Sequence, residues 1–184
     1  REGRIDPTPM AAIAGQGHQH FLTRIAGLGR KPLVKDLSIL GDTLLRPWTY
    51  ADTEQTLRWD PLEDRRYALG FADPSGEKIR TSAGANVLAV TGFPLLTTAP
   101  GAHGLLATAC RRDGRFWEVR WPIWTHACGL ATILAMLRRD DLVHASSEDR
   151  ASWLRRGVID IRRSRRVQSG KYFNFERAAS VWTE

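Results

Sequence analysis

The sequence predicts a mixed α+β fold: a compact domain with two β-hairpins in its middle, short flanking helices and a basic C-terminal strand. Apolar residues recur at helical spacing toward both ends of the chain, whereas strand-like runs separated by turn residues occupy the middle. The 184 residues suffice for one domain, and glycine and proline are spread along the chain instead of forming a linker. We therefore expect residues 1–184 to be a single α+β domain, and the start at Arg1 suggests the C-terminal part of a longer protein.

Two short helices are expected near the N-terminus. Apolar side chains three and four residues apart predict the first helix over residues 21–28. The second helix is expected over residues 37–45, with Asp36 as its N-cap and Pro47 ending it. Each would bury one apolar stripe against the rest of the domain.

Two hairpins are expected in the middle of the chain. The first comprises residues 67–81, with the turn signal Asp-Pro-Ser-Gly at residues 73–76. The second has strands over residues 105–110 and 116–121 on either side of Arg112-Asp113-Gly114, where glycine supplies a positive φ.

Three further helices complete the expected fold. One lies between the hairpins, over residues 84–90. Another covers residues 130–139, and the last begins at Ser147 as its N-cap and carries Trp153 and Leu154 toward the core.

Positive charge is concentrated near the C-terminus. Lys plus Arg number 27 against 20 Asp plus Glu, a net charge of +7. Residues 155–177 hold eight basic and two acidic residues, which leaves nineteen basic and eighteen acidic residues for the remaining chain. Nearly all the excess is therefore local, as a site that binds a polyanion requires.

The basic segment is expected to form a strand over residues 161–167. Arg163 and Arg165 would share one face, and Arg162 and Arg166 the other. Because both faces are polar, we expect an edge strand, an extended arm or a covered interface strand. The aromatic rings that follow, from Tyr172 to Phe175, either stack on bases or fill the core while the arginines form a solvated face.

Signatures of catalysis or metal binding are absent from the sequence. It contains no Gly-x-Ser-x-Gly, His-Glu-x-x-His or Cys-x-x-Cys motif, and its five histidines are scattered. The acids Asp60, Glu63 and Asp64 suggest a metal-dependent nuclease, but Arg65 and Arg66 follow directly, and an ion-paired turn fits better. We expect a protein that is not an enzyme, with no cofactor, no metal and no small-molecule substrate.

The cellular setting follows from two further absences. No apolar run approaches the roughly 18 residues that a membrane crossing needs. Only two cysteines, Cys110 and Cys128, are present, which supports no disulfide framework and indicates a reducing cytoplasm. We expect a cytoplasmic protein without a membrane partner.

Several strings within residues 57–175 resemble a known family, the large-subunit-type proteins (Csb/Csx group) of the type I-G, formerly I-U, CRISPR interference complex. The resemblance implies a role in antiviral defence. The strings are Leu57–Leu69, Gly84–Ala89, Phe93-Pro94-Leu95, Thr98-Ala99-Pro100, Trp121-Pro122-Ile123-Trp124, Arg163-Ser164-Arg165-Arg166 and Gly170-Lys171-Tyr172.

The resemblance implies a non-catalytic subunit of an RNA-guided, Cascade-type ribonucleoprotein, with other Cascade subunits, guide RNA and target DNA as partners. On this hypothesis an inner set of residues holds phosphates or stacks on an unpaired base, and an outer set makes secondary contacts. The inner set is Arg162, Arg163, Arg165, Arg166, Lys171, Tyr172 and Phe175, and the outer set is Arg65, Arg66 and Arg80. The alternative is a protein-docking subunit that uses Trp117, Trp121 and Trp124 without touching nucleic acid.

Overall fold

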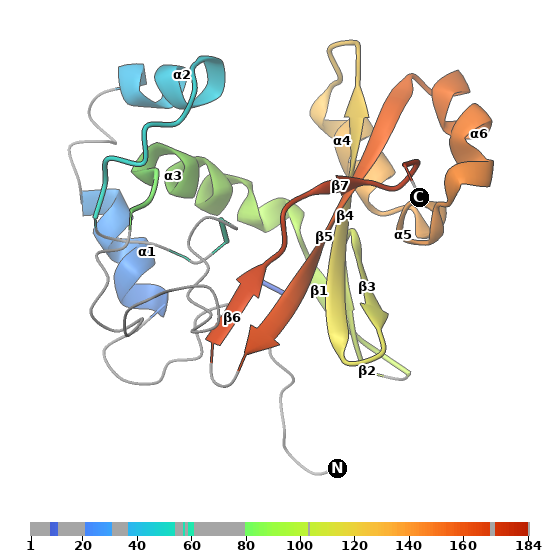
Figure 1. Ribbon diagram of the computed structural model, residues 1–184, viewed down its shortest axis with the longest axis horizontal. Helices are drawn as coiled ribbons and strands as arrows, with labels where there is room; N and C mark the ends of the chain where they lie inside the picture. The colour runs from blue at the N-terminus through green and yellow to red at the C-terminus, as the bar shows by residue number, and fades with distance from the viewer. Residues whose placement is uncertain are drawn as a thin grey trace. The chain divides into compact units, whose positions relative to one another are not determined.

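The chain forms two compact units, which we call the sheet unit and the helical unit. The sheet unit consists of Arg1–Pro9, Leu95–Val167 and Glu176–Glu184, and the helical unit of Met10–Pro94 and Gln168–Phe175. The computed structural model describes residues 8–10, 21–30, 37–53, 57, 59–60, 80–102, 104–169 and 172–183. Helices and antiparallel sheets together confirm the α+β class (Figure 1), while the single-domain expectation stays a prediction.

The helical unit contains the first three predicted helices: α1 (Phe21–Arg30), α2 (Leu37–Leu45) and α3 (Ala83–Gly92). The Ser82 side chain caps α3 by accepting a hydrogen bond from the backbone N–H of Ala85. The core of the unit is formed by Leu28, Leu57 and Ala83, with Ile25, Ile39, Trp59, Val87 and Val90 packed against them.

The segment just after α3 adds an aromatic contact to this core. Phe93 opens the short 3-10 helix η4 (Phe93–Leu95) and stacks on Trp59, with ring centroids 5.7 Å apart. The predicted hairpin over residues 67–81 lies outside the described residues except for its last two, of which Thr81 pairs with Asp52 in an isolated antiparallel bridge.

The strands of the chain form two antiparallel sheets (Figure 1). A two-stranded sheet is formed by β1 (Thr98–Gly101) and β2 (Gly104–Ala107). The larger sheet has the order β3-β4-β5-β6, and β7 also pairs with β5. Its strands are β3 (Cys110–Asp113), β4 (Phe116–Trp124), β5 (Val158–Ser169), β6 (Tyr172–Phe175) and β7 (Ala179–Ser180).

The second predicted hairpin is confirmed only in its C-terminal part. Strands β3 and β4 pair around the two-residue turn Gly114-Arg115, where Gly114 has φ +57°. The expected single strand over residues 105–110 is wrong, because the chain turns at Thr108 and Ala109 and divides this stretch between the two sheets. Ala109 takes up this turn with a positive φ of 58°.

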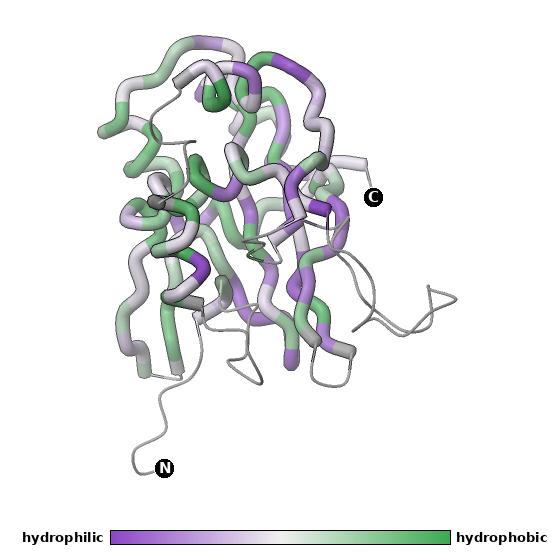
Figure 2. The backbone as a smooth tube through the Cα atoms, turned by 90° about the vertical axis from the view of Figure 1, so that its left-hand side faces the viewer, coloured by the Kyte–Doolittle hydropathy of each residue, from purple (hydrophilic) through white to green (hydrophobic). Residues whose placement is uncertain are grey.

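The predicted basic strand is confirmed as β5, and of its three expected settings the edge strand is wrong. It pairs with β4 on one side and with β6 and β7 on the other. A central strand has both rows of backbone groups satisfied, so it offers no free edge to another chain. Figure 2 shows hydrophilic residues interspersed among hydrophobic ones along the described chain.

Helices α4 (Leu130–Leu137), α5 (Asp140–His144) and α6 (Arg150–Arg155) complete the sheet unit. The expected helix after Ser147 exists, as η5 (Ser147–Asp149) leading into α6, but its N-cap is Ser146. The Ser146 hydroxyl and backbone N–H both donate to the Asp149 carboxylate. Leu154 was expected in the core, yet it is 46% exposed, because only Trp153 on this helix faces inward.

The core of the sheet unit lies where these helices meet the sheet. Its largest member is Trp153, which is 1% exposed. It packs in one cluster with Ala109, Leu142, Ala145, Val158, Ile161 and Val181. Burial of the indole and of these aliphatic side chains holds the helices and the C-terminal residues to the sheet (Figure 1).

In the described part of the chain, the helices are too short, or not apolar enough, for any of them to span a bilayer.

Candidate nucleic-acid interface

The register of β3, β4 and β5 sorts the charged residues of the sheet onto two faces. Glu118 stands opposite Arg111 on one side and Arg165 on the other, and Arg120 stands opposite Arg163. Directly paired residues of antiparallel strands share a face. The Glu118 face therefore carries Arg111, Asp113, Phe116, Glu118, Arg120, Arg163 and Arg165, and the Trp117 face carries Arg112, Trp117, Trp121, Arg162, Ser164 and Arg166.

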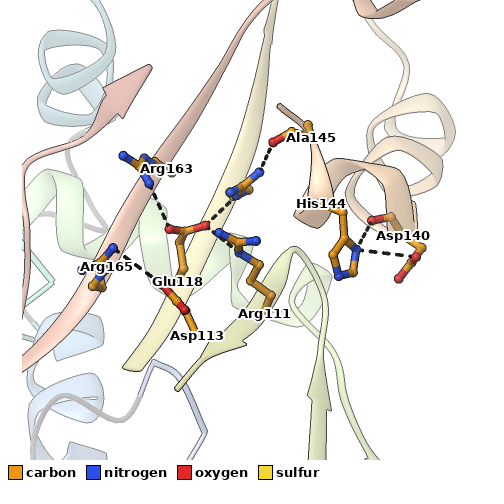
Figure 3. A network of polar contacts seen from close by, with 9 residues as sticks. Arg111, Asp113, Glu118, Asp140, His144, Ala145, Arg163 and Arg165 are labelled. Atoms are coloured by element: carbon orange, nitrogen blue, oxygen red, sulfur yellow. Dashed lines mark hydrogen bonds and ion pairs between the residues drawn. The ribbon is translucent and has the colours of Figure 1, made fainter. Parts of the chain in front are cut away.

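Glu118 is the centre of an arginine cluster (Figure 3). Its side chain is 1% exposed, and its Oε1 accepts hydrogen bonds from Arg120 Nε at 2.7 Å and from Arg111 Nε at 2.9 Å. Its Oε2 accepts no hydrogen bond from the described residues, and it lies 3.6 Å from Arg163 Nη1. One buried carboxylate thus holds three guanidinium groups from three strands, which we call the Glu118 cluster.

The charges of the Glu118 cluster support one another. Burial alone would raise the pKa of Glu118, but the hydrogen bonds from Arg120 and Arg111 and their positive charges lower it below its ordinary value. Burial also lowers the pKa of Arg120, and the hydrogen bond to Glu118 and its negative charge partly counteract this shift. Arg120 Nη1 donates in turn to the carbonyl of Ala145 at the end of α5, at 2.6 Å. The cluster therefore ties the sheet to the helical layer of its own unit.

Arg111 on the Glu118 face is partly exposed, at 30% of its side chain. Arg163 and Arg165 lie on this face together, as the sequence predicted, and they are also partly exposed. Their side chains are 22% and 35% exposed, against 4% for Arg120. Arg165 Nη2 lies 3.7 Å from Asp113 Oδ2, and Figure 3 shows the two side chains pointing toward each other. Both ion pairs are longer than a charge-assisted hydrogen bond of about 2.7–2.9 Å.

The Arg165 side chain makes no hydrogen bond in the described part of the chain, and its buried Nε has no acceptor there. Besides the ion pair with Asp113, its contact is with the ring of Phe116, with 5.9 Å between Cζ and the centroid. Arg115 also lies over this ring, at 4.9 Å. A guanidinium with unused donors beside partly exposed cations is suited to take up anionic oxygens.

The other two predicted arginines, Arg162 and Arg166, lie on the Trp117 face, opposite the Glu118 cluster. Arg162 is exposed, and its Nε donates to Asp160 Oδ2 at 2.6 Å. Arg166 is 7% exposed, and burial lowers its pKa to about 10, so that it remains cationic at neutral pH. On the same face Ser164 is 8% exposed and donates to the carbonyl of Glu176. The structure thus places Arg166 in the interior, away from the exposed position that phosphate contact requires.

Of the remaining predicted site residues, the structure describes Phe175, Tyr172 and Arg80. Phe175 is 7% exposed, so its ring fills the interior, as the alternative interpretation of these rings proposed. Tyr172 begins β6, and Arg80 is exposed in the helical unit. Arg65, Arg66 and Lys171 lie outside the described residues.

The tryptophans of the alternative interface are largely withdrawn from solvent. Trp117 is 6% exposed and lies under Arg112, 5.4 Å from the guanidinium carbon to the ring centroid. Trp121 and Trp124 are half-buried.

The described residues contain no group of three His, Cys, Asp or Glu side chains arranged to hold a metal ion. Of the proposed nuclease acids, Asp60 accepts a hydrogen bond from the Tyr50 hydroxyl at 2.9 Å, and Glu63 and Asp64 lie outside the described residues. Cys110 and Cys128 are free thiols, and burial raises the pKa of Cys110 to about 12.

Sequence reasoning missed Arg111, Arg115, Phe116, Glu118 and Arg120. A partial signal was present, because Glu118 and Arg120 stand two residues apart on a recognised strand and must share a face. The partner strand and its register decide which arginines join them, and strand register depends on the whole fold.

No protein-family model, no curated protein and no solved structure matches this chain.

Proposed function

We propose that the chain binds the sugar–phosphate backbone of a nucleic acid through Arg163 and Arg165, with Arg111 and Arg115 beside them. The observation that carries the proposal is the Glu118 cluster, because three strands bring arginines together around one carboxylate. A surface that merely needed solubility would have no reason to collect like charges at this density.

The charge balance supports the proposal. The Glu118 face holds four arginines, Arg111, Arg120, Arg163 and Arg165, against two carboxylates, Glu118 and Asp113. The segment Leu95–Val167 as a whole has thirteen arginines against seven acidic residues, an excess of six positive charges in a chain whose net charge is +7. The sheet unit therefore carries most of the field that would attract a polyanion.

The geometry of the arginines supports phosphate as the ligand. Glu118 fixes Arg111 and Arg120 by short hydrogen bonds, so their guanidinium groups are already ordered before any ligand arrives. Arg163 and Arg165 are partly exposed, and a guanidinium has five N–H donors, so each can donate to an incoming oxygen. Contacts of this kind position a nucleic acid without reading its sequence.

The wider role that we propose rests on the family resemblance of the sequence. In that role the chain is a non-catalytic, cytoplasmic subunit of a Cascade-type CRISPR ribonucleoprotein, and it contacts guide RNA or target DNA while base pairing supplies specificity. Isolating the native assembly tests this role: other subunits and an RNA with repeated guide elements should co-purify with the chain. A protein-only assembly that survives nuclease and high salt would contradict it and favour the protein-docking alternative.

Equilibrium binding of a labelled oligonucleotide, measured over a range of salt concentrations, tests the interface itself. The double variant Arg163→Ala with Arg165→Ala should weaken binding about 10- to 100-fold at low salt. The slope of log K against log salt should also fall by roughly 0.7–0.9 for each phosphate that the variant no longer neutralises.

A charge-matched control distinguishes a local site from general charge attraction. Arg138 and Arg155 are both exposed on the helices of the same unit, outside the Glu118 face. Arg138→Ala with Arg155→Ala removes the same charge and should leave the slope close to that of the wild type. Equal losses in the two double variants, or an unchanged slope for Arg163→Ala with Arg165→Ala, would remove these arginines from the interface.

A further inference from the structure

The ring of Phe116 lies where β3 turns into β4, at the end of the Glu118 face. It follows directly on the two-residue turn Gly114-Arg115 and stands opposite Asp113. The guanidinium carbon of Arg115 lies 4.9 Å from the ring centroid, and that of Arg165 lies 5.9 Å from it. One half-buried aromatic ring is thus in contact with two arginines, Arg115 and Arg165.

This end of the sheet is accessible. Asp113, Gly114 and Arg115 are all exposed, and a Cβ added at Gly114 would meet no atom within 4 Å. Phe175, one of the rings that the sequence suggested for stacking, is buried in the interior. Trp117, next to Phe116, points to the opposite face and is 6% exposed.

We propose that this end of the Glu118 face binds single-stranded nucleic acid, with an unpaired base stacked on Phe116 and with Arg115 and Arg165 on the flanking phosphates. The inference rests on the proposed function, and it specifies which nucleic acid the site selects. A duplex hides the faces of its bases, whereas a single strand offers them to an aromatic ring.

The contacts of Arg115 allow a base to replace its guanidinium group on the Phe116 ring. Within the part of the chain that the structure describes, Arg115 makes no ion pair, and its contact is with the Phe116 ring. An exposed cation–π contact is weaker than the stacking of a base on an aromatic side chain. A base can therefore displace the guanidinium from the ring, and the released Arg115 gains a phosphate oxygen as its new partner.

The test compares Phe116→Leu with Phe116→Trp in the full chain. The probes are labelled oligothymidylate, labelled oligouridylate and a DNA duplex of the same length. Phe116→Leu should weaken binding of the single strands about 5- to 100-fold, the range for loss of one stacked base. Its duplex affinity and salt slope should stay at the wild-type values, and Phe116→Trp should bind single strands at least as tightly as the wild type.

A direct measurement accompanies the affinities. Photocross-linking with 5-iodouracil in the single strand should attach to the peptide Phe116–Arg120 in the wild type and lose most of its yield in Phe116→Leu. The ratio of the DNA and RNA affinities then identifies the strand chemistry that the site prefers.

The two proposals fail in different ways. If Phe116→Leu binds single strands like the wild type, or loses single-strand and duplex binding equally, the stacking site is refuted. The backbone interface still stands in that case if Arg163→Ala with Arg165→Ala lowers the salt slope. Should Phe116→Leu unfold, which its free energy of unfolding would reveal, weak single-strand binding by a folded Phe116→Trp would refute the stacking site instead.

Discussion

Two carboxylates of the sheet unit are each held by arginines, one inside the sheet and one on the helical surface. Glu118 is 1% exposed and accepts hydrogen bonds from Arg111 and Arg120, with Arg163 nearby. Asp141 is 43% exposed, and it binds Arg139 at 2.6 Å and Arg156 at 2.9 Å. The distances are similar in the two groups, and the surroundings are different.

The comparison indicates that burial, more than the donor–acceptor distances, determines how much an ion pair contributes to stability. Hydrogen bonds from Arg139 and Arg156 and their charges lower the pKa of Asp141, while burial opposes them only in part. Water screens that group, and its two arginines also lie over the Trp153 ring, so it adds little beyond packing. Glu118 has no such screening, and its loss would leave Arg120 charged in the interior.

The largest effect is therefore expected for Glu118→Ala. Removing one partner of a buried pair leaves an uncompensated charge, and we expect a loss of about 3–5 kcal/mol in the free energy of unfolding. Urea unfolding followed by tryptophan fluorescence measures it. A loss below about 1 kcal/mol, typical of a surface pair, would contradict the expectation that Glu118 contributes more stability than Asp141.

A second variant separates charge from packing in that result. Glu118→Leu combined with Arg120→Met removes both partners of the buried pair and keeps apolar volume. Because neither charge is then left buried alone, the double variant should be more stable than Glu118→Ala. A double variant as unstable as Glu118→Ala would assign the loss to packing.

Local sequence signals predicted the helices better than the sheet. Capping residues and apolar spacing located α1, α2, α3 and α4, and Gly114 located the β3–β4 turn. The edge strand, one of three settings expected for β5, is wrong because that prediction assumes that a central strand needs an apolar face, and this holds only where no carboxylate neutralises its arginines. Here Glu118 neutralises arginine charge beside β5. Which arginines it pairs with depends on the strand register, and no local sequence pattern specifies that register.

Lowering the pH should reduce the stabilisation that the Glu118–Arg120 pair provides. The pKa of Glu118 is lowered in the folded protein from an ordinary value of 4.5, so its stabilisation is complete above that pH and is lost as pH falls through the folded pKa. The difference in unfolding free energy between the wild type and Glu118→Gln should be constant from about pH 6 to 8 and shrink below about pH 4.5. A difference that grows on acidification would contradict the assignment.

The smallest effect is expected for Asp141→Ala. Exposed ion pairs contribute about 0.2–1 kcal/mol, and salt screens them, so the loss should be of this size and fall further at high ionic strength. The same urea experiment in low and high salt measures it. A loss equal to that of Glu118→Ala would show that exposure does not separate the two groups.

The same contrast decides the central claim, that the arginines around Glu118, and not those around Asp141, meet the phosphate backbone. The most direct measurement follows the arginine Nε–H signals by NMR while a single-stranded oligonucleotide is added, with assignments from single Arg→Lys variants. We predict that the signals of Arg163 and Arg165 shift with saturation while those of Arg139 and Arg156 stay in place. Shifts at Arg139 and Arg156 with none at Arg163 and Arg165 would contradict it.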